Sequence, residues 1–225
     1  MEHGFSSDWQ RYNRILKQRN AHLKTCNSYA DLNIWDKEFT QLANSINQAR
    51  IKEFLQLKRH LEDIQSIFLP QYRVQYQLYS GWDSAAVETF SQQLEDSYKI
   101  DKRYGYTNIG AHKLDIKITI DNHQIQDVLS RGEQKMLVNA MHIAQAKRLS
   151  SDLEKKCLLL IDDLPSEIDH EKQQLLIKEL TKLEDVQLFI TAISAIDLNY
   201  TNFNKQQTPI KMFHVEQGSV SVVVS

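Results

Sequence analysis

The chain has 225 residues, of which 41% are hydrophobic and 25% charged, a profile that argues against wholesale disorder. The formal net charge of -2 means that any contact with nucleic acid must come from local basic patches. Cys26 and Cys157 lie far apart and form no CxxC pair, which implies neither a zinc site nor a disulfide framework and favours a reducing compartment. We expect no signal peptide, because the first residues, MEHGFSSDWQ, contain neither a basic nor an apolar region. We also expect no membrane span, because no apolar run reaches roughly 18 residues.

The first part of the chain predicts helices. Apolar side chains recur at helical spacing over residues 8–25, with Asp8 in the N-cap position. A longer helical segment covers residues 29–69; its two apolar runs slip phase at Arg50, and Pro70 ends it. Two interpretations of this long helix stay open: an arm of a coiled coil, or a helix packed within its own domain.

Strands and helices alternate in the rest of the chain, which predicts an α/β fold after a break in composition near residues 103–106. The expected segments are a strand at 72–80, a helix at 84–99, a strand at 113–120, a helix at about 132–149, a strand at 157–161, a helix at about 170–183, a strand at 186–191 and a hairpin at 211–224 that turns near Gly218. The continuous apolar strands have the pattern of strands buried on both faces of a mostly parallel sheet.

Two carboxylates directly follow the first of these apolar strands. Asp162 and Asp163 would lie at the carboxyl edge of the sheet, where ligands bind in open α/β folds. This is the form of a Walker B element. Asp162 would hold Mg²⁺, which favours a few carboxylates plus phosphates, and Asp163 would position the water that attacks a terminal phosphate. An apolar strand before two acids is a weak signal by itself.

The stretch LSRGEQK, residues 129–135, opens the preceding helix. Gly132 lets the backbone come close to a phosphate, the helix N-terminus presents N–H groups to an anion, and the Ser130 hydroxyl adds a donor. A plain serine-capped helix is the alternative. The stretch resembles the LSGGQ-type signature of ABC-class ATPases, with Arg131 in place of the first glycine. The signature, the acidic strand and a turn at residues 166–169 follow one another in the order of that class.

No phosphate-binding P-loop occurs in the chain. The motif G-x-x-x-x-G-K-[ST] requires a Gly-Lys pair, and none is present. The chain alone is therefore not expected to bind a nucleoside triphosphate in the usual way; either it is the C-terminal part of a longer ATPase, or it supplies half of a site to a partner. A sheet without its N-terminal strands is expected to expose edges and apolar faces, and so to associate.

Over nearly its whole length the chain resembles the RecF family of SMC-like ABC ATPases, and the run through residues 129–169 is specific. The stretches that carry the resemblance are WQRYNRILKQRN (9–20), WDKEF (35–39), GAHKLD (110–115), LSRGEQK (129–135), LLLIDDLPSEID (158–169), TAIS (191–194) and KMFHVEQG (211–218). Ala111 stands where the family usually has proline.

The resemblance implies a partial ABC/SMC-like ATPase lobe preceded by a largely helical lobe. Residues 1–104 would form most of the helical lobe, and residues 105–225 the returning C-terminal part of the ATPase lobe, without its Walker A part. The family dimerises on ATP, each signature closing over the γ-phosphate held by the other protomer. Carried over, the catalytic residue would be Asp163, the Mg²⁺ ligand Asp162, and the ATP-contacting residues Ser130, Arg131, Gly132, Gln134, Ser166 and Asp169.

The resemblance also implies partners. The ATP-dependent homodimer would clamp gapped, double-stranded and single-stranded DNA in the cytoplasm, work with RecR and promote RecA loading in replication, recombinational gap repair and the SOS response. Two further features suit slow, DNA-stimulated ATP hydrolysis. Position 163 is an aspartate, and Ala192 stands after Thr191 in place of a switch histidine.

The residues that contact DNA are expected on the first helix, which is basic. They are Arg11, Arg14, Lys17 and Arg19, with Lys24 beyond them. A solvated helix face is the alternative interpretation. His112, within GAHKLD, is expected to be structural. Two other functions stay open for the whole chain: a non-enzymatic scaffold or interaction fragment, and, more distantly, a transporter-type nucleotide domain, which would lack the long helical insertion.

Overall fold

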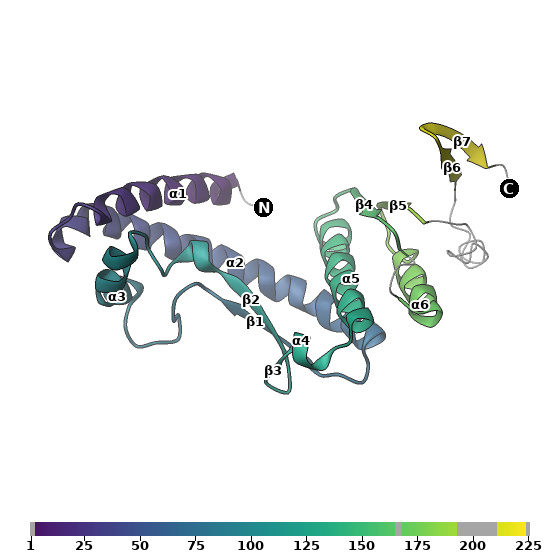
Figure 1. Cartoon of the computed structure of the whole chain (residues 1–225), viewed down its shortest axis with the longest axis horizontal. Helices are drawn as coiled ribbons and strands as arrows, with labels where there is room; N and C mark the ends of the chain where they lie inside the picture. Colours follow the sequence, from purple (N-terminus) through teal and green to yellow (C-terminus); the bar gives the residue numbers. More distant parts are fainter. Residues whose placement is uncertain (1–2, 165–167, 193–210, 224–225) are drawn as a thin grey trace. The chain divides into compact units, whose positions relative to one another are not determined.

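The computed structural model describes residues 3–164, 168–192 and 211–223, and the chain forms two compact units (Figure 1). Unit 1 comprises Met1–Lys58 and Gln75–Asp121, and unit 2 comprises Arg59–Val74 and Asn122–Ser225. These two units are defined by how compactly their residues pack. The boundary expected at residue 104 separates the two lobes implied by the family resemblance, and it stays a prediction. No helix in the described part of the chain is both long enough and apolar enough to cross a membrane.

Unit 1 is mainly helical. Its elements are α1 (His3–Leu23), the short helix η1 (Tyr29–Leu32), the first part of α2 (Asn33–Phe68), β1 (Val74–Tyr79), α3 (Phe90–Tyr104), η2 (Ala111–Lys113) and β2 (Asp115–Ile120). One core cluster joins α1, α2 and α3 through Tyr12, Phe39 and Leu94, each of which is fully buried. The second apolar run of α2 is buried as well, through Leu61 and Ile64. The first part of the long helix is therefore packed within unit 1 and its end within unit 2, which favours packing within the chain over an arm of a coiled coil.

The helix expected at 84–99 begins later, at Phe90, because two local devices decide its start. The Asp83 carboxylate accepts the N–H groups of Ala85 and Ala86, which organises a turn before the helix. Thr89 then forms a capping box with Gln92, in which each side chain accepts the other residue's N–H. Val87, which lies within the range expected for this helix, is consequently fully exposed.

Unit 2 carries the α/β part of the chain. Besides the end of α2, its elements are β3 (His123–Gln124), α4 (Ile125–Val128), α5 (Arg131–Lys147), the π-helical turn η3 (Arg148–Asp152), β4 (Cys157–Ile161), α6 (His170–Leu180), β5 (Val186–Ile190), β6 (Met212–Glu216) and β7 (Ser219–Val223). The strands β4 and β5 pair in parallel, from Cys157 opposite Val186 to Ile161 opposite Ile190. The antiparallel β6 and β7 form the expected hairpin, which turns at Gly218 with φ +79°.

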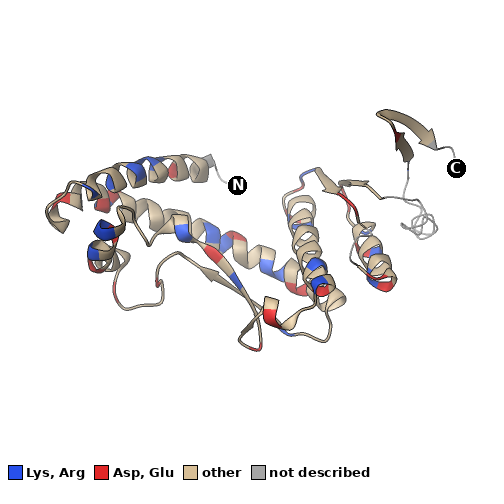
Figure 2. Cartoon of the chain, viewed as in Figure 1, with Lys and Arg blue, Asp and Glu red and all other residues tan. Residues whose placement is uncertain are grey.

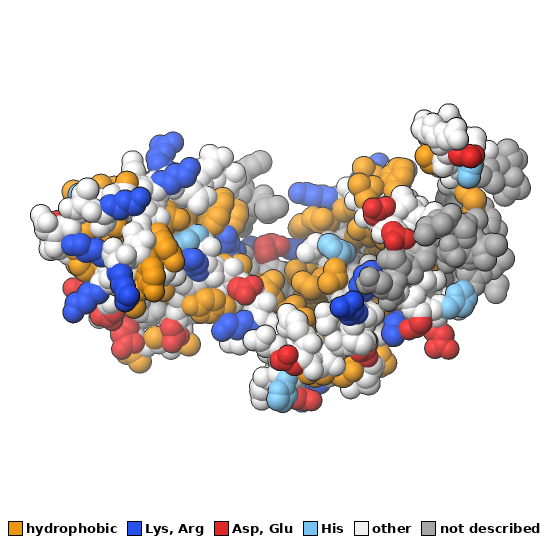
Figure 3. All heavy atoms as spheres, viewed as in Figure 1, with side chains coloured by type: hydrophobic (Ala, Val, Ile, Leu, Met, Phe, Trp, Pro, Cys, Tyr) orange, Lys and Arg blue, Asp and Glu red, His pale blue; other side chains and the backbone are white. Residues whose placement is uncertain are grey.

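The strands β4 and β5 are not buried on both faces, which corrects the expectation from their apolar sequences. Leu158 and Leu160 are 67% and 73% exposed, and Phe189, opposite Leu160, is 48% exposed. On the other face Leu159 and Ile161 are partly buried. Among the described residues no element covers the outer face, so an apolar surface remains open, as expected for an incomplete sheet. Figure 3 shows hydrophobic side chains at the surface of unit 2.

Candidate functional site

The two carboxylates lie where the acidic motif predicts them, directly after β4. Asp162 and Asp163 are exposed, and the chain turns at Asp163, whose φ of +50° is a conformation that aspartate tolerates better than most residues. Thr191, directly after β5, donates its hydroxyl to Asp162 Oδ1 at 2.5 Å and accepts the N–H of Asp163 at 2.9 Å. Thr191 was not among the expected site residues. The sequence feature that could have predicted it is its position as the first polar residue after the second parallel strand.

The signature stretch opens α5, and Ser130 is its N-cap. The Ser130 hydroxyl donates to Glu133 Oε2 at 2.7 Å and accepts the Glu133 N–H at 3.4 Å, while the Ser130 N–H donates to the same carboxylate at 2.9 Å. This is a capping box, as in the serine-capped alternative. Ser130 and Arg131 are nevertheless exposed, so the helix N-terminus remains open to an anion.

The carboxylate of Glu133 stays ionised beside this serine. Burial raises the pKa of Glu133, but the hydrogen bonds from the Ser130 hydroxyl and N–H and from Tyr72 outweigh it, so the pKa lies below its ordinary value. Gln134 donates its side-chain N–H to the Leu129 carbonyl at 2.9 Å. Ser130 and Gln134 are thus engaged within the turn that opens α5, and an incoming anion would compete with Glu133 for the Ser130 hydroxyl.

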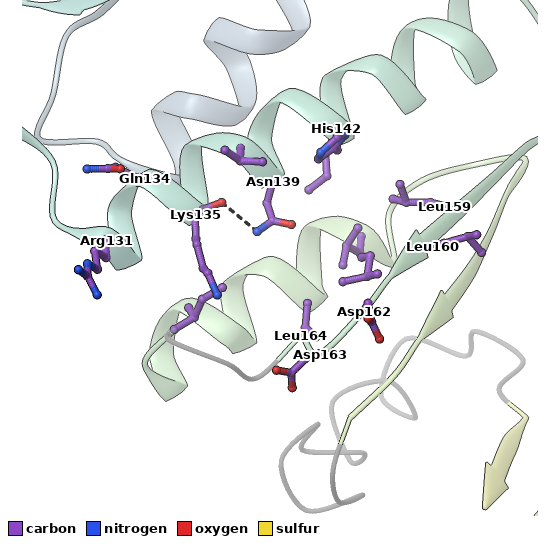
Figure 4. Close-up of a pocket in the computed structure, with 15 residues that line it drawn as sticks. Arg131, Gln134, Lys135, Asn139, His142, Leu159, Leu160, Asp162, Asp163 and Leu164 are labelled. Atoms are coloured by element: carbon purple, nitrogen blue, oxygen red, sulfur yellow. Dashed lines mark hydrogen bonds between the residues drawn. The ribbon is translucent and has the colours of Figure 1, made fainter. Parts of the chain in front are cut away.

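A pocket of about 550 Å³ extends from the signature to the acids (Figure 4). Its polar lining comprises Arg131, Gln134, Lys135, Asn139, His142, Asp162 and Asp163. Arg131 lies at one side of the pocket, at the start of α5, and the two acids lie at the other side, after β4. The sequence analysis did not predict three of these residues, Lys135, Asn139 and His142. The pattern that could have predicted them is the spacing of four and then three residues, which places polar side chains on one face of α5.

The other residues expected to contact the nucleotide lie in different parts of the chain. Asp169 caps α6: its carboxylate accepts the Lys172 N–H at 2.9 Å and forms an ion pair with Lys172 Nζ at 2.6 Å. The Lys172 side chain, more than any other group, holds the pKa of Asp169 below its ordinary value. Gly132 lies in the first turn of α5. Ser166 lies outside the described residues.

The carboxylates of Asp162 and Asp163 fit a divalent cation whose remaining ligands are phosphates and waters. In the described part of the chain no group of three or more His, Cys, Asp or Glu side chains could hold a metal ion. Mg²⁺ needs only one or two carboxylates when phosphates and waters complete its shell, so the exposed Asp162 is sufficient for this role.

Three of the four expected DNA-contacting residues are exposed on α1, which carries several basic positions in Figure 2. Arg11 forms an ion pair with Glu38 at 2.6 Å, and Arg14 and Lys17 face solvent. Arg19 is fully buried, so its side chain is unavailable to DNA in this structure, which corrects the expectation for this residue.

A polar network in the interior of unit 1 explains the burial of Arg19. Its guanidinium donates to Asp36 Oδ1 at 2.7 Å, to Asp101 Oδ2 at 3.0 Å and to Thr107 Oγ1 at 2.7 Å. His112 has a structural role, as expected. Its ring nitrogens bond the Tyr12 hydroxyl at 2.8 Å and the Thr107 carbonyl at 3.0 Å.

Comparison with known proteins finds similar proteins of one name, although no family model matches the chain. Proteins named "DNA replication and repair protein RecF" are 37% identical in Vibrio atlanticus (strain LGP32) over 219 residues and 38% identical in Psychromonas ingrahamii over 218 residues. The protein of that name in Shewanella baltica (strain OS185) is 39% identical over 222 residues. Each match covers 97% of this chain and 59% of the relative, so the chain spans about three fifths of the relatives' length.

Solved structures agree with this assignment at the level of the fold. Two structures of the recombination mediator protein RecF in the RecFOR pathway, described as RecF-ATPrS and RecF-ATP, match with a TM-score of 0.75 at 19% and 23% sequence identity. Each match covers 99% of this chain and 60% of the other. The fold is therefore that of a partial RecF lobe with a helical region. Over 97% of its length, the chain is therefore similar to proteins named RecF, which supports a RecF-like fragment.

Proposed function

We propose that the chain is part of an ATP-gated DNA-binding protein of the RecF type, to which it contributes the signature and the Walker B acids of an ATP site. The observation that carries the proposal is the end of β4. Asp162 and Asp163 follow a strand in a parallel pair, are bonded to the end of its neighbour at Thr191, and line one pocket with the signature residue Arg131.

The two acids have different roles in this proposal. Asp162 holds Mg²⁺, whose charge, when the ion is bound, stabilises the charge that develops on the phosphates. Asp163 orients the water that attacks the γ-phosphate. It accepts a proton of this water as the new oxygen–phosphorus bond forms and the bond from the γ-phosphorus to the departing ADP breaks. The exposure of both carboxylates and the hydrogen bond that fixes Asp162 support these roles.

The signature acts on a second copy of the protein. Ser130, Arg131 and Gly132 contact the γ-phosphate held by the sister protomer, and Gln134, Ser166 and Asp169 contribute to the same interface. The exposure of Ser130 and Arg131 at the start of α5 supports this arrangement, because these residues are accessible to a second molecule. ATP therefore gates dimerisation.

The P-loop belongs to the part of RecF that this chain does not cover. We call this portion, as found in the Vibrio atlanticus relative, the complementary part. The relatives' greater length and the open apolar face of β4 and β5, with Leu158, Leu160 and Phe189, support this proposal. The complementary part would cover that face and supply the phosphate-binding loop of the same ATP site.

The complete dimer binds DNA in the cytoplasm, acts with RecR and promotes RecA loading at gapped DNA, including in the SOS response. Arg11, Arg14 and Lys17 contact phosphates from the exposed face of α1. Their exposure and the relatives' name as DNA replication and repair proteins support this part of the proposal. A second candidate function, a non-enzymatic scaffold, is favoured by the absence of a P-loop from the chain.

Complementation distinguishes the two functions. The chain is mixed with the complementary part, and ATP hydrolysis is measured with and without DNA; we expect slow hydrolysis that DNA stimulates. The variant Asp163→Asn should nearly abolish turnover yet preserve ATP-dependent dimerisation, measured by light scattering, because asparagine tolerates the turn at this position. The matched control is Asp185→Asn, an exposed aspartate with φ +54° that directly precedes β5. Absence of hydrolysis in a complex that forms would favour the scaffold.

A further inference from the structure

Thr191 makes four hydrogen bonds with the segment that carries the two acids. Its N–H donates to the Ile161 carbonyl at 3.0 Å, and its carbonyl accepts the Leu164 N–H at 3.2 Å. Its hydroxyl donates to Asp162 Oδ1 at 2.5 Å and accepts the Asp163 N–H at 2.9 Å. The backbone bonds join the ends of β4 and β5, whereas both bonds of the hydroxyl go to the acids.

The direction of these bonds follows from the groups involved. An ionised carboxylate can only accept, so the single hydroxyl proton of Thr191 points to Asp162, and a lone pair is left for the Asp163 N–H. A hydrogen bond to an ionised acceptor is about twice as strong as one between neutral groups. The hydroxyl therefore limits the rotation of the Asp162 carboxylate and supports the backbone of Asp163, whose φ is +50°.

Burial does not account for this arrangement. Thr191, Asp162 and Asp163 are all exposed, so water could satisfy each polar group if the hydroxyl were absent. The two backbone bonds would also remain with any residue at position 191 that keeps the strand end. The threonine hydroxyl is thus not needed to hold the sheet together, and its contacts bear on the orientation of the acids.

We propose that Thr191 is a positioning residue that presets Asp162 for the divalent cation and Asp163 for the attacking water. The inference rests on the ATPase role proposed above. It makes the residue that follows β5 a member of the proposed ATP site. The protein prepares the carboxylate before the metal arrives, so less rotational freedom is lost on binding.

The first test measures metal binding. The chain is assembled with the complementary part and ADP, and Mn²⁺, as the probe for Mg²⁺, is titrated by electron paramagnetic resonance. Thr191→Val, which keeps the shape and removes the hydroxyl, should lower Mn²⁺ affinity roughly 10-fold or more, as is typical for loss of an outer-shell partner. Thr191→Ser should restore it. The control is Thr181→Val, which removes a hydroxyl that donates to the Lys178 carbonyl at 3.0 Å.

The second test separates positioning from folding in the same assembly. Thr191→Val should lower kcat for ATP hydrolysis roughly 10- to 100-fold. KM for ATP should change little, because the P-loop proposed for the complementary part would make most of the phosphate contacts. Its melting temperature should stay within a few degrees of that of the unchanged protein, since only exposed hydrogen bonds are lost.

The outcomes separate this inference from the proposed function. If Asp162→Asn weakens Mn²⁺ binding and Thr191→Val does not, Asp162 holds the metal without help from Thr191, and the inference is overturned alone. If Asp162→Asn also leaves Mn²⁺ binding unchanged, the proposed metal site and the inference both fail. Failure of Thr191→Ser to restore affinity would likewise contradict a role for the hydroxyl.

Discussion

Two arginines on α1 have opposite environments, although both belong to the same basic pattern in the sequence. Arg14 faces solvent, whereas Arg19 is fully buried with Asp36 and Asp101. A buried arginine between two carboxylates is held by its partners, and removing it leaves their charges uncompensated in the interior. At the scale of single residues, therefore, position within the tertiary structure decides whether an arginine serves stability or contacts with other molecules.

We expect Arg19→Ala to lower the free energy of unfolding by roughly 3–5 kcal/mol, the range for breaking a buried ion pair. Arg14→Ala should change the free energy of unfolding by no more than about 0.5 kcal/mol, as at most surface positions. Urea unfolding followed by circular dichroism measures both. If Arg19→Ala were as stable as Arg14→Ala, the buried network would not stabilise unit 1.

The same pair of variants tests contact with DNA. Arg14→Ala should reduce the slope of log affinity against log salt concentration by about one if Arg14 neutralises one phosphate. Fluorescence anisotropy of labelled DNA, with the chain and the complementary part at several salt concentrations, measures the slope. An unchanged slope would support the alternative that this face of α1 is only solvated.

The stability of unit 1 should depend on pH through His112. Burial lowers the pKa of His112 in the folded state, so the folded protein resists a proton that the unfolded chain accepts below about 6.5. The contribution of His112 is therefore present above that pH and is lost as pH falls through the folded-state pKa. If Nε2 of the neutral ring donates to the Thr107 carbonyl, Nδ1 accepts the Tyr12 hydroxyl proton. Protonation would place a second N–H on Nδ1, facing that hydroxyl.

Urea unfolding at pH 7.5 and pH 5 checks this dependence. The unchanged protein should lose more stability between the two values than His112→Gln, which cannot take up the proton. Other groups titrate in this interval, so the difference between the two proteins is the quantity that isolates His112. Equal losses would exclude His112 as the source.

At the scale of elements, two helices begin with the same device but in different surroundings. Ser130 caps α5 and Thr89 caps α3, each through a capping box. The start of α5 adjoins the pocket through Arg131, whereas α3 lies in unit 1. The two caps have the same local chemistry, so they form a matched pair that separates helix capping from contact with a nucleotide.

Ser130→Ala and Thr89→Ala should each lower the free energy of unfolding by about 1 kcal/mol through loss of the cap. Only Ser130→Ala should also weaken ATP-dependent dimerisation of the assembled protein, because only this serine is proposed to contact the sister protomer's phosphate. Urea unfolding and light scattering measure the two effects. Equal dimerisation by both variants would leave Ser130 with a capping role alone.

At the scale of the whole molecule, the open face of β4 and β5 governs association. Leu158 is 67% exposed on a strand whose outer face no described element covers, so the isolated chain should self-associate. Leu158→Lys should reduce this association and also weaken assembly with the complementary part. The control is Val87→Lys, at a fully exposed position in unit 1. Size-exclusion chromatography measures both, and a monomeric, cooperatively folded chain would contradict the expectation.

Local patterns in the sequence determined the elements of the site. The apolar run at 157–161 predicts β4 at its observed bounds, and the next apolar run predicts its parallel neighbour. The acids after β4 and the serine before α5 could be placed because strand ends and helix caps depend on a few adjacent residues. The RecF resemblance, which the relatives confirm, rests on the same stretches.

Contacts between distant residues were decided only by the tertiary structure. The burial of Arg19 depends on Asp36 and Asp101, which the chain brings to it from other helices. The hydroxyl of Thr191 meets Asp162 because parallel strands end at one edge of the sheet, a relation that no local pattern contains. The sequence of β4 is apolar on both faces, whereas the described part of the chain covers one, because burial depends on what packs against a strand as well as on its own residues.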